Sequence, residues 1–173
     1  MSRLLIICCL SLFALSACKK ANGDVAQIKE QAAKDDQLLR DYIAQNGLSG
    51  VAKQVKPLGS NVDTIGVWYI VSNPGTGSNV IANSSLITVG YTGKILTTGT
   101  VFASTDTFHP AYTLGNLIKG WQLGLTYSGV KKGGKVRLLM ASRYGYGPYD
   151  QPNLNLPANS VLDFDIDIFD ITN

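Results

Sequence analysis

From about residue 64 onward, apolar and polar side chains alternate with the period of two that is typical of half-buried β-strands. The clearest case is the C-terminal segment, in which Leu162, Phe164, Ile166 and Ile168 fall on one face and aspartates lie between them. Shorter strand-like runs occupy residues 67–71, 87–91, 101–102 and 135–140. Because turn sequences rich in glycine separate several of these runs, the pattern predicts an antiparallel sheet of about five or six strands.

One segment within this region has the spacing of an α-helix instead. Residues 116–127 place Leu117, Trp121 and Leu125 on one side, which is the period of an amphipathic helix. A single short helix beside an antiparallel sheet belongs to the α+β class. The sequence therefore predicts one α+β domain over residues 64–173.

The region before this domain has a different texture. Residues 24–46 have helical spacing, but their apolar stripe, which includes Leu39 and Ile43, is thin. This favours a solvated spacer or a helix docked on its own domain, and a dimerising helix is the alternative. Residues 47–63 mix Gly, Ser, Lys and Pro as linkers do. We therefore expect residues 18–63 to be a helical spacer and linker.

The first residues have the organisation of a bacterial lipoprotein signal. Arg3 precedes a mostly apolar run of 11 residues, which is too short for the ~20 that a membrane-spanning helix needs. The run is followed at residues 15–18 by Leu-Ser-Ala-Cys, which resembles the bacterial lipobox. The resemblance implies a signal peptide over residues 1–17, lipid attached to Cys18, and an anchor in the bacterial cell envelope, on the periplasmic side of the outer membrane.

Composition and charge exclude other classes of protein. Of the 173 residues, 45% are hydrophobic and 16% are charged, and the formal net charge is +3. The chain is too apolar for a disordered protein and too weakly basic for a nucleic-acid-binding domain, so no nucleic-acid partner is expected. All three cysteines lie at or before Cys18, which leaves the folded domain without a thiol or a disulfide.

Familiar catalytic and metal-binding sets are missing from the sequence. The one histidine, His109, cannot form a multi-histidine metal site, and no Gly-x-Ser-x-Gly motif is present. Asp163, Asp165 and Asp167 recur at a period of two, which spaces carboxylates ~6–7 Å apart along one face of a strand. We therefore expect a solvated acidic face rather than a cation site, and neither a metal nor a cofactor.

Four short motifs follow one another along the predicted domain. Residues 89–102 resemble Val-x-Tyr-x-Gly-x-Leu and then Gly-x-x-Phe, with Ile95 in place of Leu, and residues 117–124 resemble Val-Ile-x-Gly-Trp-x-x-Gly, with Leu117 in place of Val. Residues 144–147 are similar to Tyr-Ala-Tyr-Gly, and residues 156–165 to Ile-Pro-Pro-Asn-x-x-Leu-x-Phe-Asp. In type and order these motifs resemble the FKBP-type peptidyl-prolyl cis-trans isomerases, over residues 65–171.

The resemblance implies a curved antiparallel sheet wrapped on one short helix, with a substrate pocket between them. It implies proline-containing polypeptides as substrates and macrolides of the tacrolimus and rapamycin type as candidate inhibitors. Carried over by position, the catalytic residues are Tyr91, Phe102, Ile118, Trp121, Tyr146 and Phe164. The substrate-binding residues are Ala103, Tyr112, Leu117 and Leu156.

These roles also account for the missing acids, bases and metals. In the resemblance, Trp121 forms the floor under the prolyl ring, the Ile118 backbone N–H bonds the peptide, and the Tyr146 hydroxyl bonds a substrate carbonyl. An X-Pro amide isomerises by rotation over a barrier of ~18–20 kcal/mol. A pocket that desolvates the amide favours its less polar twisted form, so no proton needs to move.

One departure from the family pattern leaves a second function open. Ala103 stands where the pattern has Asp, so a carboxylate beside the pocket is missing. The sequence therefore predicts a prolyl isomerase that acts on exported proteins, with a chaperone-like peptide-binding module of weak or no isomerase activity as the alternative. A purely structural envelope domain is the third interpretation, and Tyr146 together with the proline-rich loop argues against it.

Overall fold

The computed structural model describes residues 25–56 and 66–173. The signal peptide and the lipid attachment at Cys18 that the sequence predicts lie outside these residues. The chain divides into two compact units, residues 1–34 and 35–173. Among the described residues, no helix is long and apolar enough to cross a membrane.

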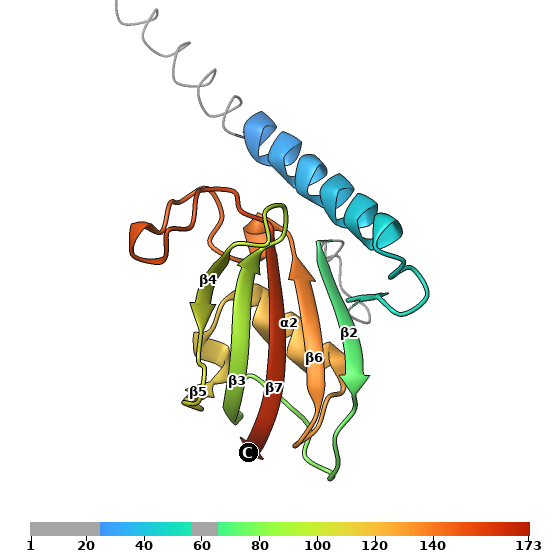
Figure 1. Ribbon diagram of the computed structural model, residues 1–173, viewed down its shortest axis with the longest axis vertical. Coiled ribbons are helices and arrows are strands. Elements are labelled where there is room, and N and C mark those ends of the chain that lie inside the picture. Colours follow the sequence, from blue (N-terminus) through green and yellow to red (C-terminus); the bar gives the residue numbers. More distant parts are fainter. Residues whose placement is uncertain (1–24, 57–65) are drawn as a thin grey trace, which may run out of the picture. The chain divides into compact units, whose positions relative to one another are not determined.

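The larger unit is built on one antiparallel sheet (Figure 1). The strand order is β1-β2-β6-β7-β3-β4, and β5 also pairs with β3. One helix, α2 (Lys119–Ser128), lies behind the sheet in this view. The strands are β1 (Lys53–Gln54), β2 (Val67–Asn73), β3 (Leu86–Ile95), β4 (Val101–Ser104), β5 (Ala111–Thr113), β6 (Lys135–Met140) and β7 (Leu162–Thr172).

The architecture confirms the predicted α+β class and the sheet wrapped on a short helix. The pattern did not predict β1 and β5, because strands of two and three residues are too short for alternation to show. The helix begins at Lys119 rather than at residue 116. Leu114–Asn116 form a 3-10 turn, and Leu117 and Ile118 are extended, with Ile118 at φ −57° and ψ 149°.

The inner face of the sheet packs against α2, which contacts β2 and β6. Leu125 of the helix and Leu138 of β6 are fully buried, and Phe164 and Ile166 of β7 are 3% and 2% exposed. Burying each such side chain contributes ~1.5–3 kcal/mol. A Cβ on Gly124 would lie 2.6 Å from Cδ2 of Leu138. Glycine at this position therefore allows the helix to lie close against the sheet.

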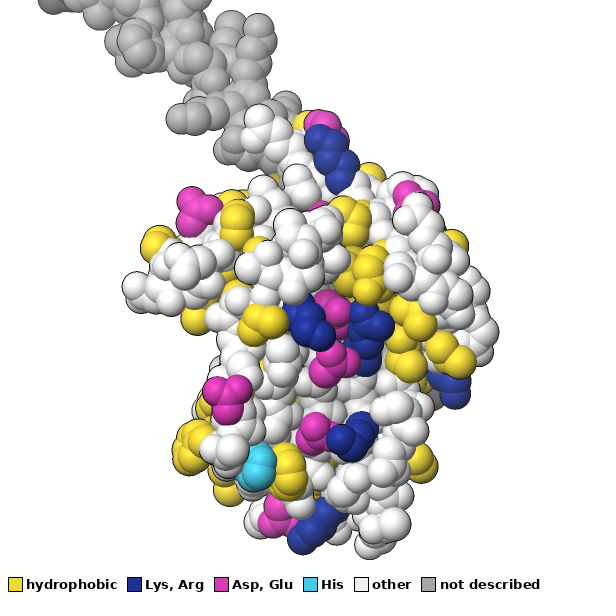
Figure 2. Space-filling model, viewed as in Figure 1, with side chains coloured by type: hydrophobic (Ala, Val, Ile, Leu, Met, Phe, Trp, Pro, Cys, Tyr) yellow, Lys and Arg dark blue, Asp and Glu magenta, His cyan; other side chains and the backbone are white. Residues whose placement is uncertain are grey.

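The outer face of the sheet carries cross-strand ion pairs. Lys94 Nζ lies 3.0 Å from Asp165 Oδ2, and Lys135 Nζ lies 2.7 Å from Asp167 Oδ1. Figure 2 shows the resulting alternation of basic and acidic side chains over this face. Because the side chains of both pairs are about a third or more exposed, the contribution of each pair to stability is small, ~0–1 kcal/mol. The pairs leave no uniformly acidic or basic patch on the strands that carry them.

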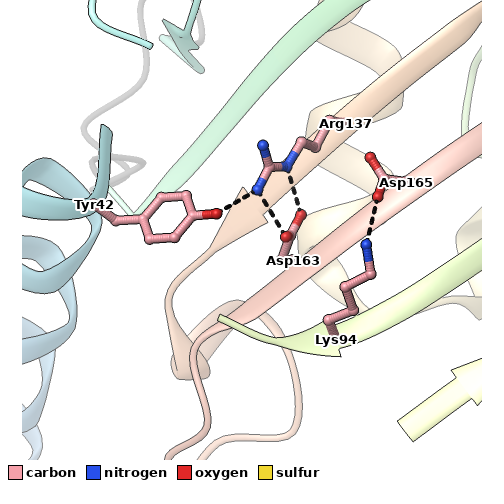
Figure 3. Close-up of polar contacts among 5 residues, drawn as sticks. All are labelled: Tyr42, Lys94, Arg137, Asp163 and Asp165. Atoms are coloured by element: carbon pink, nitrogen blue, oxygen red, sulfur yellow. Dashed lines mark hydrogen bonds and ion pairs between the residues drawn. The ribbon is translucent and has the colours of Figure 1, made fainter. Parts of the chain in front are cut away.

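Asp163 departs from the expected solvated face. Asp163 is only 5% exposed, and its two carboxylate oxygens accept hydrogen bonds of 2.8 Å from Nε and Nη2 of Arg137. Arg137 Nη2 also donates to the Tyr42 hydroxyl at 2.7 Å (Figure 3). The prediction of solvation is wrong at Asp163, because a residue from the N-terminal helix lies beside this end of the face.

The helix predicted near the N-terminus is described over residues 25–45. Its part from Asp35 onward belongs to the larger unit. Leu39 is fully buried and Ile43 is 5% exposed, and both join the core cluster that contains Leu139 of β6. The compact unit therefore begins at Asp35, earlier than the residue at which the strand pattern starts, because this helical segment packs its apolar residues into the core.

Candidate active site

A cavity of about 180 Å³ opens where α2 meets the sheet. Nine residues line it, and all nine belong to the set that the sequence places in the site. Leu156, the tenth residue that the sequence places in the site, does not line the cavity. It is 2% exposed and lies in the loop before β7, where its carbonyl accepts from Gln151 N at 2.8 Å. The lining residues are Tyr91, Phe102, Ala103, Tyr112, Leu117, Ile118, Trp121, Tyr146 and Phe164.

A β-bulge in β4 aims two consecutive side chains at the cavity. Gly93 pairs with Ala103 and Lys94 pairs with Val101, which leaves Phe102 as the extra residue. Strict alternation would place Phe102 and Ala103 on opposite faces of the strand. The bulge removes this constraint, and both residues line the cavity.

Phe164 is the centre of the aromatic packing. Its ring lies 5.3 Å from that of Trp121 and 5.5 Å from that of Phe102, edge to face in both cases. The ring of Tyr91 lies 6.2 Å away and is tilted by 57°. A Cβ on Gly93 would lie 2.7 Å from Cε1 of Phe164, so this close approach requires glycine. The mutual contacts hold the rings in fixed orientations around the cavity.

Trp121 lies in the first turn of α2 and is 3% exposed. Its ring meets that of Tyr91 edge to face, with centroids 5.2 Å apart and planes at 87°. Its Nε1 is buried and has no hydrogen-bond partner among the described residues. A buried unpaired donor costs ~1–3 kcal/mol, and such exceptions in native proteins call for a functional explanation. The indole gives the cavity an apolar surface, and the buried Nε1 without a partner is the energetic cost of placing it there.

Two phenols of the cavity are held in their neutral form. Burial first, and then the charge interaction and hydrogen bond with Tyr112, raise the pKa of Tyr91 to about 12. Burial also raises the pKa of Tyr146. A phenol is already protonated at neutral pH, and the raised pKa values keep both groups protonated at alkaline pH as well, so each can donate a hydrogen bond without carrying charge. The backbone of Tyr91 is fixed by Thr105, whose Oγ1 accepts from Tyr91 N at 2.9 Å.

The chain just before α2 adds a backbone donor. Leu117 N donates to Leu114 O at 3.0 Å, and Ile118 O accepts from Trp121 N at 3.0 Å. The Ile118 N–H itself has no acceptor among the described residues. Because Ile118 is only partly buried and lines the cavity, its N–H is available to a bound peptide.

The chemistry of the cavity follows from what its lining contains. None of the nine lining residues is Asp, Glu, His, Lys, Arg or Cys. In the described part of the chain, no group of three His, Cys, Asp or Glu side chains could hold a metal ion. The cavity can take an apolar group out of water, and uncharged hydrogen-bond donors at its edge can bind the polar atoms beside that group. This arrangement suits a reaction in which no proton is transferred.

The fold and the cavity define a class of protein: a small α+β domain whose antiparallel sheet wraps one helix around an aromatic cavity. The sequence profile described as FKBP-type peptidyl-prolyl cis-trans isomerase matches residues 77–169, which is more than half of the chain. The chain belongs to this family.

Individual relatives extend the comparison. FkpA of Buchnera aphidicola (subspecies Schizaphis graminum) is 40% identical over 111 residues, which are 62% of this chain and 42% of that protein. FK506-binding protein 1 of Saccharomyces cerevisiae is 33% identical over 102 residues, which are 57% of this chain and 87% of that protein. The crystal structure of FkpA from Escherichia coli matches 94% of this chain with a TM-score of 0.64 and 26% identity. The chain spans less than half the length of the Buchnera relative.

Proposed function

We propose that this chain is a peptidyl-prolyl cis-trans isomerase that rotates X-Pro bonds in other polypeptides. The observation that carries the proposal is the cavity, whose lining includes the aromatic side chains of Tyr91, Phe102, Trp121, Tyr146 and Phe164, in a member of the FKBP-type family. A prolyl ring is apolar, and a cavity of this kind withdraws the ring and the adjacent amide from water. The substrates are proline-containing segments of unfolded or partly folded proteins, and macrolides such as FK506 compete for the same cavity.

The proposed mechanism is desolvation of the amide. The planar X-Pro amide is stabilised by resonance, which also makes it more polar than the twisted form and gives a barrier of ~18–20 kcal/mol. Water stabilises the polar planar form more than the twisted one. Moving the amide into the cavity removes this difference, which lowers the barrier because binding favours the twisted form. Trp121 supports the prolyl ring, while Tyr91, Phe102 and Phe164 surround the rotating carbonyl.

The substitution Tyr146→Phe tests the proposed contact to a substrate carbonyl. It removes one hydroxyl and keeps the ring, so the loss of one hydrogen bond of ~0.5–1.5 kcal/mol is expected. This corresponds to a decrease of up to about tenfold in kcat/KM or in macrolide affinity, with little change in Tm. A protease-free assay on a model X-Pro peptide measures the rate, and ligand titration measures the affinity.

Tyr149→Phe is the matched control for this substitution. Tyr149 lies three residues further along the same loop and is 71% exposed, so neither the rate nor the affinity should change. An unchanged rate and affinity in Tyr146→Phe would remove Tyr146 from the site. Wild-type protein that does not accelerate isomerisation in this assay would remove the proposed activity itself.

Ala103 is the observation that favours a second function. It lines the cavity as a methyl group where the family pattern has a carboxylate. A cavity that binds proline-containing segments without efficient catalysis would act as a chaperone-like peptide-binding module. Peptide binding and suppression of aggregation without acceleration of isomerisation would favour this alternative over the enzyme.

We also propose that the protein is anchored by lipid on Cys18 in the bacterial cell envelope, where it assists exported proteins. The support is the apolar run followed by the Leu-Ser-Ala-Cys motif at residues 15–18. A clickable fatty acid fed to expressing cells should label the wild type, and Cys18→Ser should abolish the label. Cys9→Ser is the control: it removes a thiol within the apolar run, and this variant should still be labelled. A labelled Cys18→Ser variant would contradict the anchor.

A further inference from the structure

A buried carboxylate from the N-terminal helix supports the turn that precedes Tyr146. Asp35 is 2% exposed, and its Oδ2 accepts two hydrogen bonds from Ser142, from the backbone N at 2.9 Å and from Oγ at 2.6 Å. The residues that follow these two are also paired: Nη2 of Arg143 donates to both carboxylate oxygens of Asp36, at 2.8 Å and 3.0 Å. Two consecutive acids of the helix therefore bind two consecutive residues of the 3-10 turn Ser142–Tyr144.

Ser142 in turn holds the peptide units on both sides of Tyr146. Its carbonyl oxygen accepts from Gly145 N at 2.9 Å and from Gly147 N at 2.8 Å. The carbonyl of Gly147 accepts from Asn159 N at 2.8 Å, which ties the turn to the loop before β7. Ser142 therefore holds the backbone on both sides of Tyr146, and Ser142 is itself fixed through its own N–H and side chain by Asp35.

We propose that Asp35 is a positioning residue for Tyr146, which acts through Ser142 to set the direction in which the Tyr146 hydroxyl enters the cavity. The inference rests on the proposed function, in which this hydroxyl holds the substrate. Hydrogen bonds to a carboxylate are roughly twice as strong as those between neutral groups, so they restrict the turn more tightly than neutral contacts would. A small displacement of a positioned group can lower the rate strongly, even when the substitution that causes it lies far from the reacting atoms.

A double-mutant cycle separates positioning from general stability. Asp35→Asn keeps the size of the side chain and removes its charge, and it should lower kcat/KM about three- to tenfold, by no more than Tyr146→Phe does. In the Tyr146→Phe background the same substitution should change kcat/KM by less than about twofold, because the hydroxyl that is positioned is gone. Equal losses in both backgrounds would overturn the inference.

Two further variants control the cycle. Asp41→Asn makes the same charge change on an exposed residue of the same helix, whose Oδ1 accepts from Gln37 Nε2 at 2.8 Å, and it should leave kcat/KM unchanged. Ser142→Ala removes one of the two donors to Asp35 and should reproduce the loss in the wild-type background. A Ser142→Ala variant that folds normally and is as active as the wild type would contradict the proposed route.

Amide hydrogen exchange tests the same coupling without any assay of activity. In Asp35→Asn the amides of Gly145 and Gly147 should exchange about tenfold faster or more, while amides of β7 keep their protection. Wild-type protein without isomerase activity would remove the proposed function but would still allow this test. Unchanged protection of both glycine amides in Asp35→Asn would show that Asp35 does not hold the turn.

Discussion

Phe164→Ala should lower the free energy of unfolding by about 3–5 kcal/mol, because truncating a buried phenylalanine leaves a cavity that its surroundings fill only in part. Phe164 is 3% exposed and lies between the rings of Trp121 and Phe102 at 5.3 and 5.5 Å. For a unit of this size, each kcal/mol shifts Tm by roughly 2–4 °C. Thermal denaturation followed by circular dichroism should therefore show a decrease of roughly 6–20 °C.

Phe169→Ala is the matched control on the same strand. Phe169 is 44% exposed and stacks on His109 with ring centroids 3.7 Å apart. Its truncation removes surface contacts alone, so the loss should stay within about 1 kcal/mol. Similar losses for the two substitutions would contradict the central place of Phe164 in the packing. Below its Tm, Phe164→Ala should also lose isomerase activity, because it opens one wall of the cavity.

Alternation and motif order were sufficient to predict most of the sheet and the lining of the cavity. In β7, apolar residues at every second position, including Phe164 and Ile166, point to the core. This pattern is strong because the strand is long, with 11 residues, and lies between two neighbours. The motif around Trp121 placed this aromatic residue in the helix; the structure has it in the first turn, whereas the pattern had it in the middle of residues 116–127. The alternation in β7 and the motif around Trp121 can both be recognised within a short stretch of sequence, without knowledge of distant contacts.

What could not be predicted depends on contacts between distant segments. Asp35 and Ser142 are separated by 107 positions, and neither has a neighbour in the sequence that indicates the other. The burial of Asp163 likewise depends on Arg137 and Tyr42, which lie on another strand and on the N-terminal helix. Polar residues show no periodicity that identifies a partner, so only the folded chain reveals which carboxylates are buried.

Ala103→Asp is expected to raise kcat/KM on a model X-Pro peptide by about five- to thirtyfold, the rate factor that a contact of ~1–2 kcal/mol in the transition state provides. Ala103 lines the cavity and pairs with Gly93, two residues along β3 from Tyr91. A carboxylate at this position would give the Tyr91 hydroxyl a charged acceptor. It would also place a fixed charge beside the rotating amide, where it discriminates the twisted form from the planar one.

The opposing effect is the cost of burying a charge in a cavity that is packed around a methyl group. Ala103→Asn separates the two effects, because it adds a side chain of the same size without the charge. If the carboxylate is what the wild type lacks, Ala103→Asp should be faster than both Ala103→Asn and the wild type, and its Tm should be no lower than that of Ala103→Asn. An Ala103→Asp variant whose circular dichroism melting matches the wild type, but whose kcat/KM is no higher, would show that the missing carboxylate does not limit catalysis.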